Sequence, residues 1–153
     1  MTWTAAEQFC VTDYGGHLAS FHSEEEYIAV MNGLEEQHGT RPHGWIGLTD
    51  VSKEGVFVWS DGSSSIWTDN WVPGKPAGEN GCVENSFQFP KWRDIKCAET
   101  AVHAISGARY SLGAICKRSA GELSPIKNKS TSIWLVVLLP EQGLVEARHT
   151  TSA

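Results

Sequence analysis

The four cysteines of this sequence, Cys10, Cys82, Cys97 and Cys116, constrain its fold more than any other feature. No two of them form a C-x-x-C pair, and their spacing does not match a zinc ribbon or a zinc finger. An even number of cysteines in a chain rich in glycine and tryptophan favours two disulfides and an oxidising compartment. The alternative is four reduced cysteines in the core of a cytosolic protein. Four cysteines allow three connectivities, and spacing alone does not choose among them.

The composition fits one globular domain and argues against several classes of function. At 153 residues the chain is long enough for a single substantial core. A net charge of -6, without long runs of Lys or Arg, argues against a nucleic-acid partner. The longest apolar stretch, residues 133–139, is too short to span a bilayer, and no signal peptide opens the sequence. No nucleophile elbow, phosphate-binding loop or acid–base pair is found, so we do not expect an enzyme.

Two helices followed by short strands are predicted, which is an α+β arrangement. Capping-box patterns begin the helices at Thr4 and at Ser23, and glycines end them near residues 15–16 and at Gly39. Strands are expected at residues 45–48, 56–59, 82–84 and 110–116. Residues 69–81 are rich in Gly, Pro and Asn and show little periodic pattern, which predicts a long functional loop.

The seven tryptophans of the sequence predict an aromatic core and an aromatic binding face. Trp45, Trp59 and Trp92 lie in strand-like runs, so we expect them in the core. Trp67 and Trp71 flank the long loop, and a place in the core and a place at the ligand are about equally expected for them.

A series of short motifs runs through residues 1–118: MTWTAAEQFC at 1–10, GGHLAS at 15–20, WIGL at 45–48, VWSDG at 58–62, GCVE at 81–84, KWRD at 91–94 and AIC at 114–116. Each motif alone is weakly specific, whereas their order and approximate spacing together are specific. On these residues the chain resembles the C-type lectin domain family. The resemblance implies a C-type-lectin-like fold, in which two helices pack on short antiparallel sheets with a long irregular binding loop, and it implies recognition rather than catalysis.

The resemblance also implies the disulfide pairing that cysteine counting leaves open. In the family pattern Cys10 of the first helix pairs with Cys116 of the last strand, and Cys82 pairs with Cys97 beside the long loop. In the chain-entropy model the shorter bridge stabilises the fold by about 3 kcal/mol and the longer one by somewhat under about 5 kcal/mol. The shorter bridge would also brace the loop and reduce the entropy that a ligand must freeze out.

In sugar-binding members of the family, a Glu-Pro-Asn or Gln-Pro-Asp triplet with a cis proline holds a calcium ion on the long loop. This sequence has Lys75-Pro76-Ala77 at the triplet position. Calcium takes six to eight oxygen ligands. Lys75 brings a positive charge to that position and Ala77 brings no side-chain oxygen, so this triplet argues against calcium.

The family completes its calcium site with an acidic residue before the loop cysteine and with the Asn-Asp of a Trp-Asn-Asp motif. Here the first position aligns with Asn80 or, with a shift of one residue, Glu79, and the second motif reads Trp92-Arg93-Asp94. Only Asp94 is retained without argument. Calcium is therefore possible but disfavoured as a cofactor, and we assign no metal ligands.

The altered site has two interpretations of similar weight. It could be a mixed-charge surface that reads a glycan or a protein by hydrogen bonds and aromatic contacts, with the candidate ligand-binding residues Lys75, Glu79, Asn80, Trp92, Arg93 and Asp94. Alternatively, Lys75 and Arg93 could simply pair with Glu79 and Asp94 on a solvated loop.

Both ends of the chain depart from the family pattern. The usual N-terminal strand is missing, which would leave the edge at residues 110–116 unpaired. Residues 98–109 have the character of an insertion. We therefore expect a family domain over residues 1–118 and a tail over residues 119–153 with no family counterpart. We hypothesise that residues 133–139, which are rich in β-forming side chains, fold back as the missing edge strand; the alternative is a disordered tail.

These observations together predict a secreted or extracellular recognition module. The resemblance favours a carbohydrate-binding lectin with a degraded calcium site, and the altered ligand set favours a calcium-independent domain that binds a protein partner. A third, weaker hypothesis is adsorption to an ice or mineral surface. The expected partners are a glycan or a protein, with no nucleic acid and no membrane span.

Overall fold

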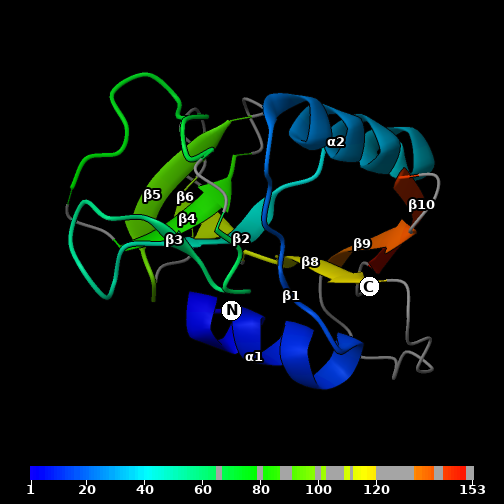
Figure 1. The fold of residues 1–153 in the computed structure, drawn as a ribbon, viewed down its shortest axis with the longest axis horizontal. Helices are drawn as coiled ribbons and strands as arrows, with labels where there is room; N and C mark the ends of the chain where they lie inside the picture. Colours follow the sequence, from blue (N-terminus) through cyan, green and yellow to red (C-terminus); the bar gives the residue numbers. More distant parts are fainter. Residues whose placement is uncertain are drawn as a thin grey trace.

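The computed structural model describes residues 1–64, 67–78, 81–86, 91–98, 101–102, 109–110, 112–119, 133–139 and 143–150. Within these ranges the chain forms two helices and ten strands (Figure 1). Glu79 and Asn80, both predicted to be near the ligand, lie outside the described residues.

Helix α1 (Trp3–Tyr14) begins two residues earlier than the sequence suggested. Its N-cap is Thr2, whose hydroxyl accepts the Ala5 N–H at 3.2 Å. The predicted capping box at Thr4 is wrong, because Glu7 does not turn back to the helix start but bonds to other segments. The helix ends as predicted at Gly15, whose φ of 66° is readily adopted only by glycine.

Helix α2 (Glu24–His38) begins and ends as predicted. The Ser23 hydroxyl accepts the Glu26 N–H at 3.1 Å, and Gly39 ends the helix with φ 69°. Three glutamates in the first turn favour the positive end of the helix dipole. The apolar face is buried in one of the two core clusters and consists of Tyr27, Val30, Met31 and Leu34.

The strands build one mixed sheet and a separate small hairpin. The order in the sheet is β10-β9-β8-β2-β4-β5, with β1 paired to β8 and β3 paired to β2. These strands are β1 (His17–Leu18), β2 (Gly44–Thr49), β3 (Val58–Trp59), β4 (Gly81–Asn85), β5 (Trp92–Lys96), β8 (Ala114–Ser119), β9 (Ile133–Leu139) and β10 (Gly143–Thr150). The hairpin pairs β6 (Ala101–Val102) with β7 (Arg109–Tyr110).

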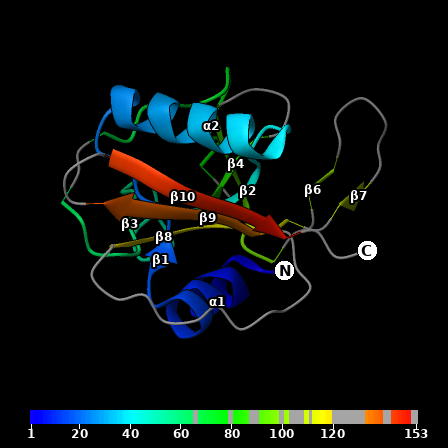
Figure 2. The same ribbon diagram turned by 90° about the vertical axis from the view of Figure 1, so that its right-hand side faces the viewer.

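The predicted α+β fold is confirmed, and the sheet adds details that the sequence did not indicate. The pairs β2–β8 and β8–β9 are parallel, whereas the other pairs are antiparallel. Strands β1, β5, β6 and β10 were not predicted, and the predicted strand at residues 110–116 is divided between β7 and β8. Figure 2 shows α2 on one side of the sheet and α1 on the other.

The segment 133–139 folds back and pairs with β8, as hypothesised, but it is not the edge strand, because β10 pairs with its other side and forms the edge of the sheet. Strand β9 runs parallel to β8, from Ile133 opposite Ala114 to Leu138 opposite Ser119. Strand β10 then pairs antiparallel with β9, and α2 contacts both strands. The boundary near residue 118 between a family domain and its tail stays a prediction, but these two segments of the tail belong to the sheet.

The core and the disulfides hold α1, the sheet and the long loop together. Both implied bridges, Cys10–Cys116 and Cys82–Cys97, are formed. Trp45, Trp59 and Trp92 are buried as predicted, with at most 3% of their surface exposed. No helix in the described part of the chain is long and apolar enough to cross a membrane.

Candidate functional site

The long loop is attached to the outer edge of β5, so this strand fixes the position of the loop. The Val72 N–H donates to the Trp92 carbonyl at 2.9 Å, and the Trp92 N–H donates to the Asn70 carbonyl at 2.7 Å. Trp71 and Trp92 form a parallel bridge at the same point. Residues that follow Trp92 in β5 therefore lie beside the loop.

Lys75 and Asp94 form a charged contact within the described part of this loop. The Lys75 Nζ lies 3.1 Å from Asp94 Oδ1 and donates to the Asp94 backbone carbonyl at 3.0 Å. Asp94 is buried, with 1% of its surface exposed, whereas the Lys75 side chain is 22% exposed. The Lys75–Pro76 bond is cis, as the resemblance implied.

The backbone beyond Pro76 also binds the Asp94 carboxylate. The Ala77 N–H donates to its Oδ2 at 2.9 Å, and the Gly78 N–H donates to the same oxygen at 3.3 Å. The carboxylate thus receives one ammonium group and two amide groups from four consecutive residues. Since each donor satisfies a buried negative charge, the loop is fixed by its own side chain and backbone.

Arg93 pairs with a residue that the sequence interpretation missed. Its Nε donates to Glu84 Oε1 at 2.7 Å, and its Nη2 donates to the same oxygen. Glu84 lies directly opposite Arg93 in the β4–β5 ladder and has no exposed surface. Of the pairings of Lys75 and Arg93 with Glu79 and Asp94 that the sequence left open, Lys75 with Asp94 is observed, whereas Arg93 pairs with Glu84. Only the register between β4 and β5 would have revealed this partner.

The buried carboxylate of Glu84 is incompletely hydrogen-bonded, which is unfavourable. Its Oε2 has no hydrogen-bond partner among the described residues. Burial raises the pKa of the Glu84 carboxyl above its ordinary value, although the Arg93 guanidinium acts in the opposite direction. Both candidate cations of the loop region, Lys75 and Arg93, are thus committed to buried carboxylates.

The aromatic residues around the loop form a cluster that extends from the core to the surface. Trp92 lies at its centre with no exposed surface, and the rings of Trp67 and Trp71 contact it with centroids 4.9 and 6.0 Å away. Trp67 and Trp71 are partly buried against the core. Phe57 packs on Trp71 at 4.9 Å and is also partly buried. The cluster therefore packs the loop residue Trp71 against the core.

An apolar strip lies next to this cluster. Val51, Val56 and Val58 are 68%, 46% and 45% exposed. Thr49 pairs with Val58 across β2 and β3, and Val51 and Val56 lie in the turn segment that joins these two strands. Gly81 connects this strip to the end of the loop, because a Cβ there would lie 2.9 Å from Val51 Cγ2.

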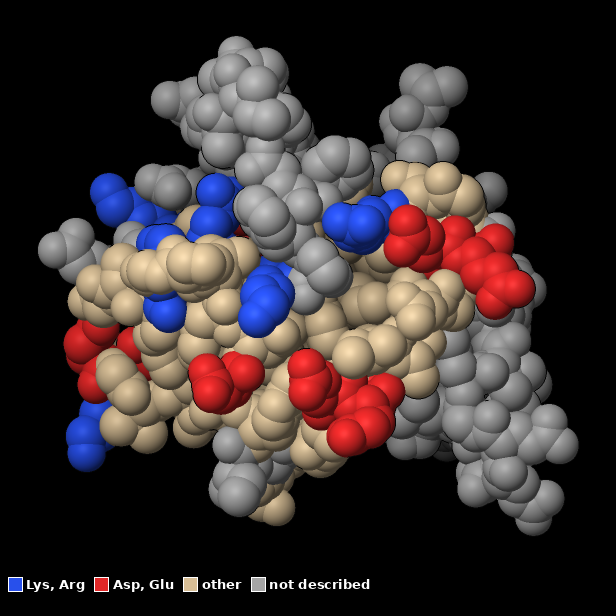
Figure 3. All heavy atoms as spheres, turned by 90° about the horizontal axis from the view of Figure 1, so that it is seen from above, with Lys and Arg blue, Asp and Glu red and all other residues tan. Residues whose placement is uncertain are grey.

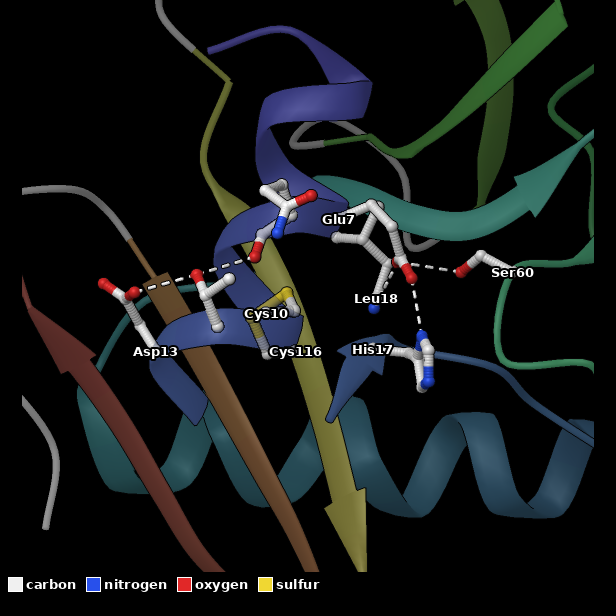
Figure 4. Close-up of a disulfide and its surroundings, with 9 residues drawn as sticks. Glu7, Cys10, Asp13, His17, Leu18, Ser60 and Cys116 are labelled. Carbon is white, nitrogen blue, oxygen red and sulfur yellow. Dashed lines mark hydrogen bonds and ion pairs between the residues drawn. A yellow bond between two sulfur atoms is a disulfide. The ribbon is translucent and has the colours of Figure 1, made fainter. Parts of the chain in front are cut away.

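A second polar network pins α1 to the sheet beside the Cys10–Cys116 bridge (Figure 4). Glu7 Oε1 lies 2.6 Å from His17 Nδ1, and Glu7 Oε2 accepts the Leu18 N–H and the Ser60 hydroxyl, both at 2.9 Å. Ser60 donates to the carboxylate and not to the imidazole, which is not the arrangement of a nucleophile and its base. The network therefore joins three segments.

Lys117 of β8 joins the start of α2 to the sheet. Its Nζ donates to the Ser20 carbonyl at 2.7 Å and to Glu26 Oε1 at 2.8 Å. Burial acts to raise the pKa of Glu26, but the hydrogen bonds from Lys117 and His22 outweigh it and lower the pKa.

On the face drawn in Figure 3, acidic and basic side chains lie in small groups.

Comparison with known proteins gives matches over the first two thirds of the chain. Residues 1–103 match the model of the lectin C-type domain. The chain is 40% identical over 100 residues to snaclec bothrojaracin subunit beta from Bothrops jararaca, covering 65% of this chain and 65% of the relative. It is 33% identical over 100 residues to the galactose-specific lectin nattectin from Thalassophryne nattereri, covering 63% and 62%. The chain thus spans less than two thirds of the length of these relatives.

A solved structure shares both fold and sequence with the chain. The crystal structure of a calcium-independent type II antifreeze protein matches with a TM-score of 0.53 and 32% sequence identity, covering 63% of this chain and 71% of the other. The agreement extends the match from sequence motifs to the arrangement of helices and strands.

Proposed function

Because the chain belongs to the C-type lectin domain family, a non-enzymatic family of ligand-recognition domains, we propose that it binds its ligand without calcium. The binding surface in this proposal comprises the exposed part of the long loop and the adjoining strip of Val51, Val56 and Val58. A disulfide-bonded domain of this family is typical of extracellular proteins, and we place the function outside the cell.

The ion pair between Lys75 and Asp94 carries the proposal. At the triplet position, where sugar-binding members hold calcium, an ammonium group lies 3.1 Å from the one retained carboxylate. Two backbone N–H groups bind the same carboxylate. The loop is thereby ordered by groups of the chain itself.

The donor set at this position does not fit a calcium ion. Calcium takes six to eight oxygens, whereas Lys75 offers a cation and Ala77 offers an N–H donor. A calcium ion would have to displace the Lys75 ammonium from Asp94 against charge repulsion. In this proposal, recognition therefore uses no metal ion.

The chemistry of the exposed surface favours a protein partner. Lys75 and Arg93 are each paired to a buried carboxylate, so these two cations offer little unpaired positive charge to a polar ligand. Three branched aliphatic side chains are exposed in the adjoining strip. Such side chains pack well against apolar protein side chains but give neither the flat ring on which a sugar stacks nor hydrogen bonds to its hydroxyls.

A glycan is the second candidate ligand, supported by the relatives. Nattectin is described as a galactose-specific lectin. Trp67 and Trp71 are partly buried beside the loop, and their exposed parts offer aromatic surface to a sugar ring. In this case too, recognition would use stacking and hydrogen bonds in place of metal coordination.

A glycan array with and without calcium tests the proposal. The chain is applied in buffer with calcium and, in parallel, in buffer with a chelator. We expect the same pattern in both conditions, either no bound glycan or glycans that remain bound in chelator. Glycans retained only in the calcium condition would contradict calcium-independent recognition.

A further inference from the structure

We propose that the Cys82–Cys97 disulfide is a reducible link whose state controls the order of the long loop, while Cys10–Cys116 holds the fold together in both states. The proposal rests on the proposed function only in taking the long loop as part of the binding surface. Its structural content concerns the two bridges and the anchor at Asp94.

The two disulfides differ in burial. Cys10 and Cys116 have no exposed surface and lie inside the second core cluster. Cys82 is also fully buried, but Cys97 is partly exposed, in the turn after β5. A reducing thiolate must reach one sulfur of a bridge, so the bridge with a cysteine at the surface reacts first.

The Cys97 sulfur lies next to Gly81 and the exposed residue Val51. A Cβ built on Gly81 would lie 3.5 Å from Cys97 Sγ and 2.9 Å from Val51 Cγ2. The sulfur thus lies beside Gly81, and the Val51 side chain fills the space that a side chain at Gly81 would take. The nearby Val51 is the most exposed of the large hydrophobic residues described.

The bridges differ in what they enclose. Cys10 and Cys116 are 106 positions apart, and their bridge ties the first helix to β8 across the whole domain. Cys82 and Cys97 are only 15 positions apart and join the ends of two strands that are already hydrogen-bonded. Opening the shorter bridge frees less chain entropy, so the β4–β5 ladder and the core persist after its reduction.

The reducible bridge is close to the loop anchor along β5. Cys97 is three positions after Asp94, whose carboxylate binds Lys75, Ala77 and Gly78. The Cys97 carbonyl accepts the Trp3 N–H at 2.9 Å, which also ties this end of β5 to the start of α1. When the bridge opens, the end of β5 frays, and Asp94 holds the loop less firmly.

The chemistry requires a dithiol as reductant. One thiolate of the dithiol attacks the Cys97 sulfur, forms a mixed disulfide and releases Cys82 as a thiolate, which takes up a proton. The second thiolate of the reductant then attacks the reductant's first sulfur in the mixed disulfide. This closes the reductant's own disulfide and releases Cys97 as a thiolate, which takes up a proton. The dithiol supplies two electrons and leaves as a disulfide.

Native-state reduction tests the order of reaction. The full chain is treated with dithiothreitol, quenched with iodoacetamide at intervals and digested for mass spectrometry. We expect Cys82 and Cys97 to be labelled at least about tenfold faster than Cys10 and Cys116. Equal rates, or earlier labelling of Cys10 and Cys116, would overturn the proposal. No ligand or calcium is needed, so this outcome is separate from the fate of the proposed function.

Hydrogen exchange tests the link to the loop. In chain reduced and alkylated only at Cys82 and Cys97, the amides of Ala77 and Gly78 should exchange about tenfold faster than in the oxidised chain. The Leu18 amide, which bonds to Glu7 beside the other bridge, serves as an internal control and should keep its rate. Unchanged exchange at Ala77 and Gly78, or equal acceleration at Leu18, would refute control of the loop by this bridge. The double variant C82S/C97S provides the same comparison without alkylation.

Discussion

At the scale of single residues, the two cations Lys75 and Arg93 form ion pairs in and beside the long loop. One of the two interpretations of the site had Lys75 and Arg93 pair with Glu79 and Asp94, and an ion pair between Lys75 and Asp94 is observed. The partner of Arg93 could not be predicted, since Glu84 becomes its neighbour only through the register of β4 and β5. In both pairs a buried carboxylate is matched by a partly exposed cation.

Substitution of Lys75 tests how far its ammonium group stabilises the loop. In Lys75→Met the Asp94 carboxylate keeps the N–H groups of Ala77 and Gly78 but loses the ammonium group of Lys75. We expect a loss of about 1–3 kcal/mol in the free energy of unfolding, measured in urea. Lys53→Met, at an exposed position, is the matched control and should change stability by less than about 0.5 kcal/mol. Equal effects for both variants would show that the ion pair adds no stability.

The raised pKa of Glu84 predicts a pH dependence of stability. The folded protein holds the Glu84 proton more tightly than the unfolded chain, whose carboxyl has the ordinary pKa of 4.5. As the pH rises from 4.5 through the folded-state pKa, ionisation of this buried group therefore lowers stability. Relative to Glu84→Gln, the wild type should lose unfolding free energy over that range. Urea unfolding at a series of pH values checks this. A wild type whose unfolding free energy, relative to that of Glu84→Gln, stays constant or rises over this range would contradict it.

At the scale of elements, helix ends were predictable because single residues define them. Ser23, Gly15 and Gly39 act as the local patterns indicate. Short strands were less predictable, since β1 has two residues and β5 combines charged and apolar residues without a clear period. What makes them strands is pairing with β8 and β4, which involves residues far away in the sequence.

The turn from α1 into β1 gives a prediction with a matched pair of glycines. A Cβ on Gly16 would lie 2.3 Å from the Lys117 carbonyl oxygen, so Gly16→Ala must push β1 away from β8. Gly15 has φ 66° and open space around it, so Gly15→Ala adds only backbone strain. We expect Gly16→Ala to cost about 3 kcal/mol and Gly15→Ala about 1–2 kcal/mol, measured by urea unfolding. A loss of stability in Gly16→Ala that is smaller than the loss in Gly15→Ala would rule out this close approach of Gly16 to Lys117.

At the scale of the whole molecule, the order of motifs predicted the family and the fold, but not how the sheet is completed. The family model matches residues 1–103, and beyond residue 118 only the β-rich composition of residues 133–139 indicated a strand. Its parallel direction and the following β10 could not be inferred, because both depend on how the chain returns to β8. The sheet therefore extends beyond the residues that resemble the family.

Hydrogen exchange of the folded protein tests this extension. The amides of β9 that pair with β8 should exchange at least about a hundredfold more slowly than exposed amides, because both neighbours of β9 hold it in the sheet. The comparison sets peptides from residues 133–139 against the exchange rates of the same sequence as an unstructured peptide. Rapid exchange throughout 133–139 would show that this strand is not part of the stable fold.

Thermal unfolding with increasing calcium tests the main conclusion most directly. A ligand that binds only the folded state raises the unfolding midpoint as its concentration exceeds the dissociation constant. With an ammonium group already on Asp94, we expect the midpoint in up to about 10 mM calcium to equal that in chelator. A midpoint that rises and saturates with calcium, and falls back when chelator is added, would contradict recognition without a metal.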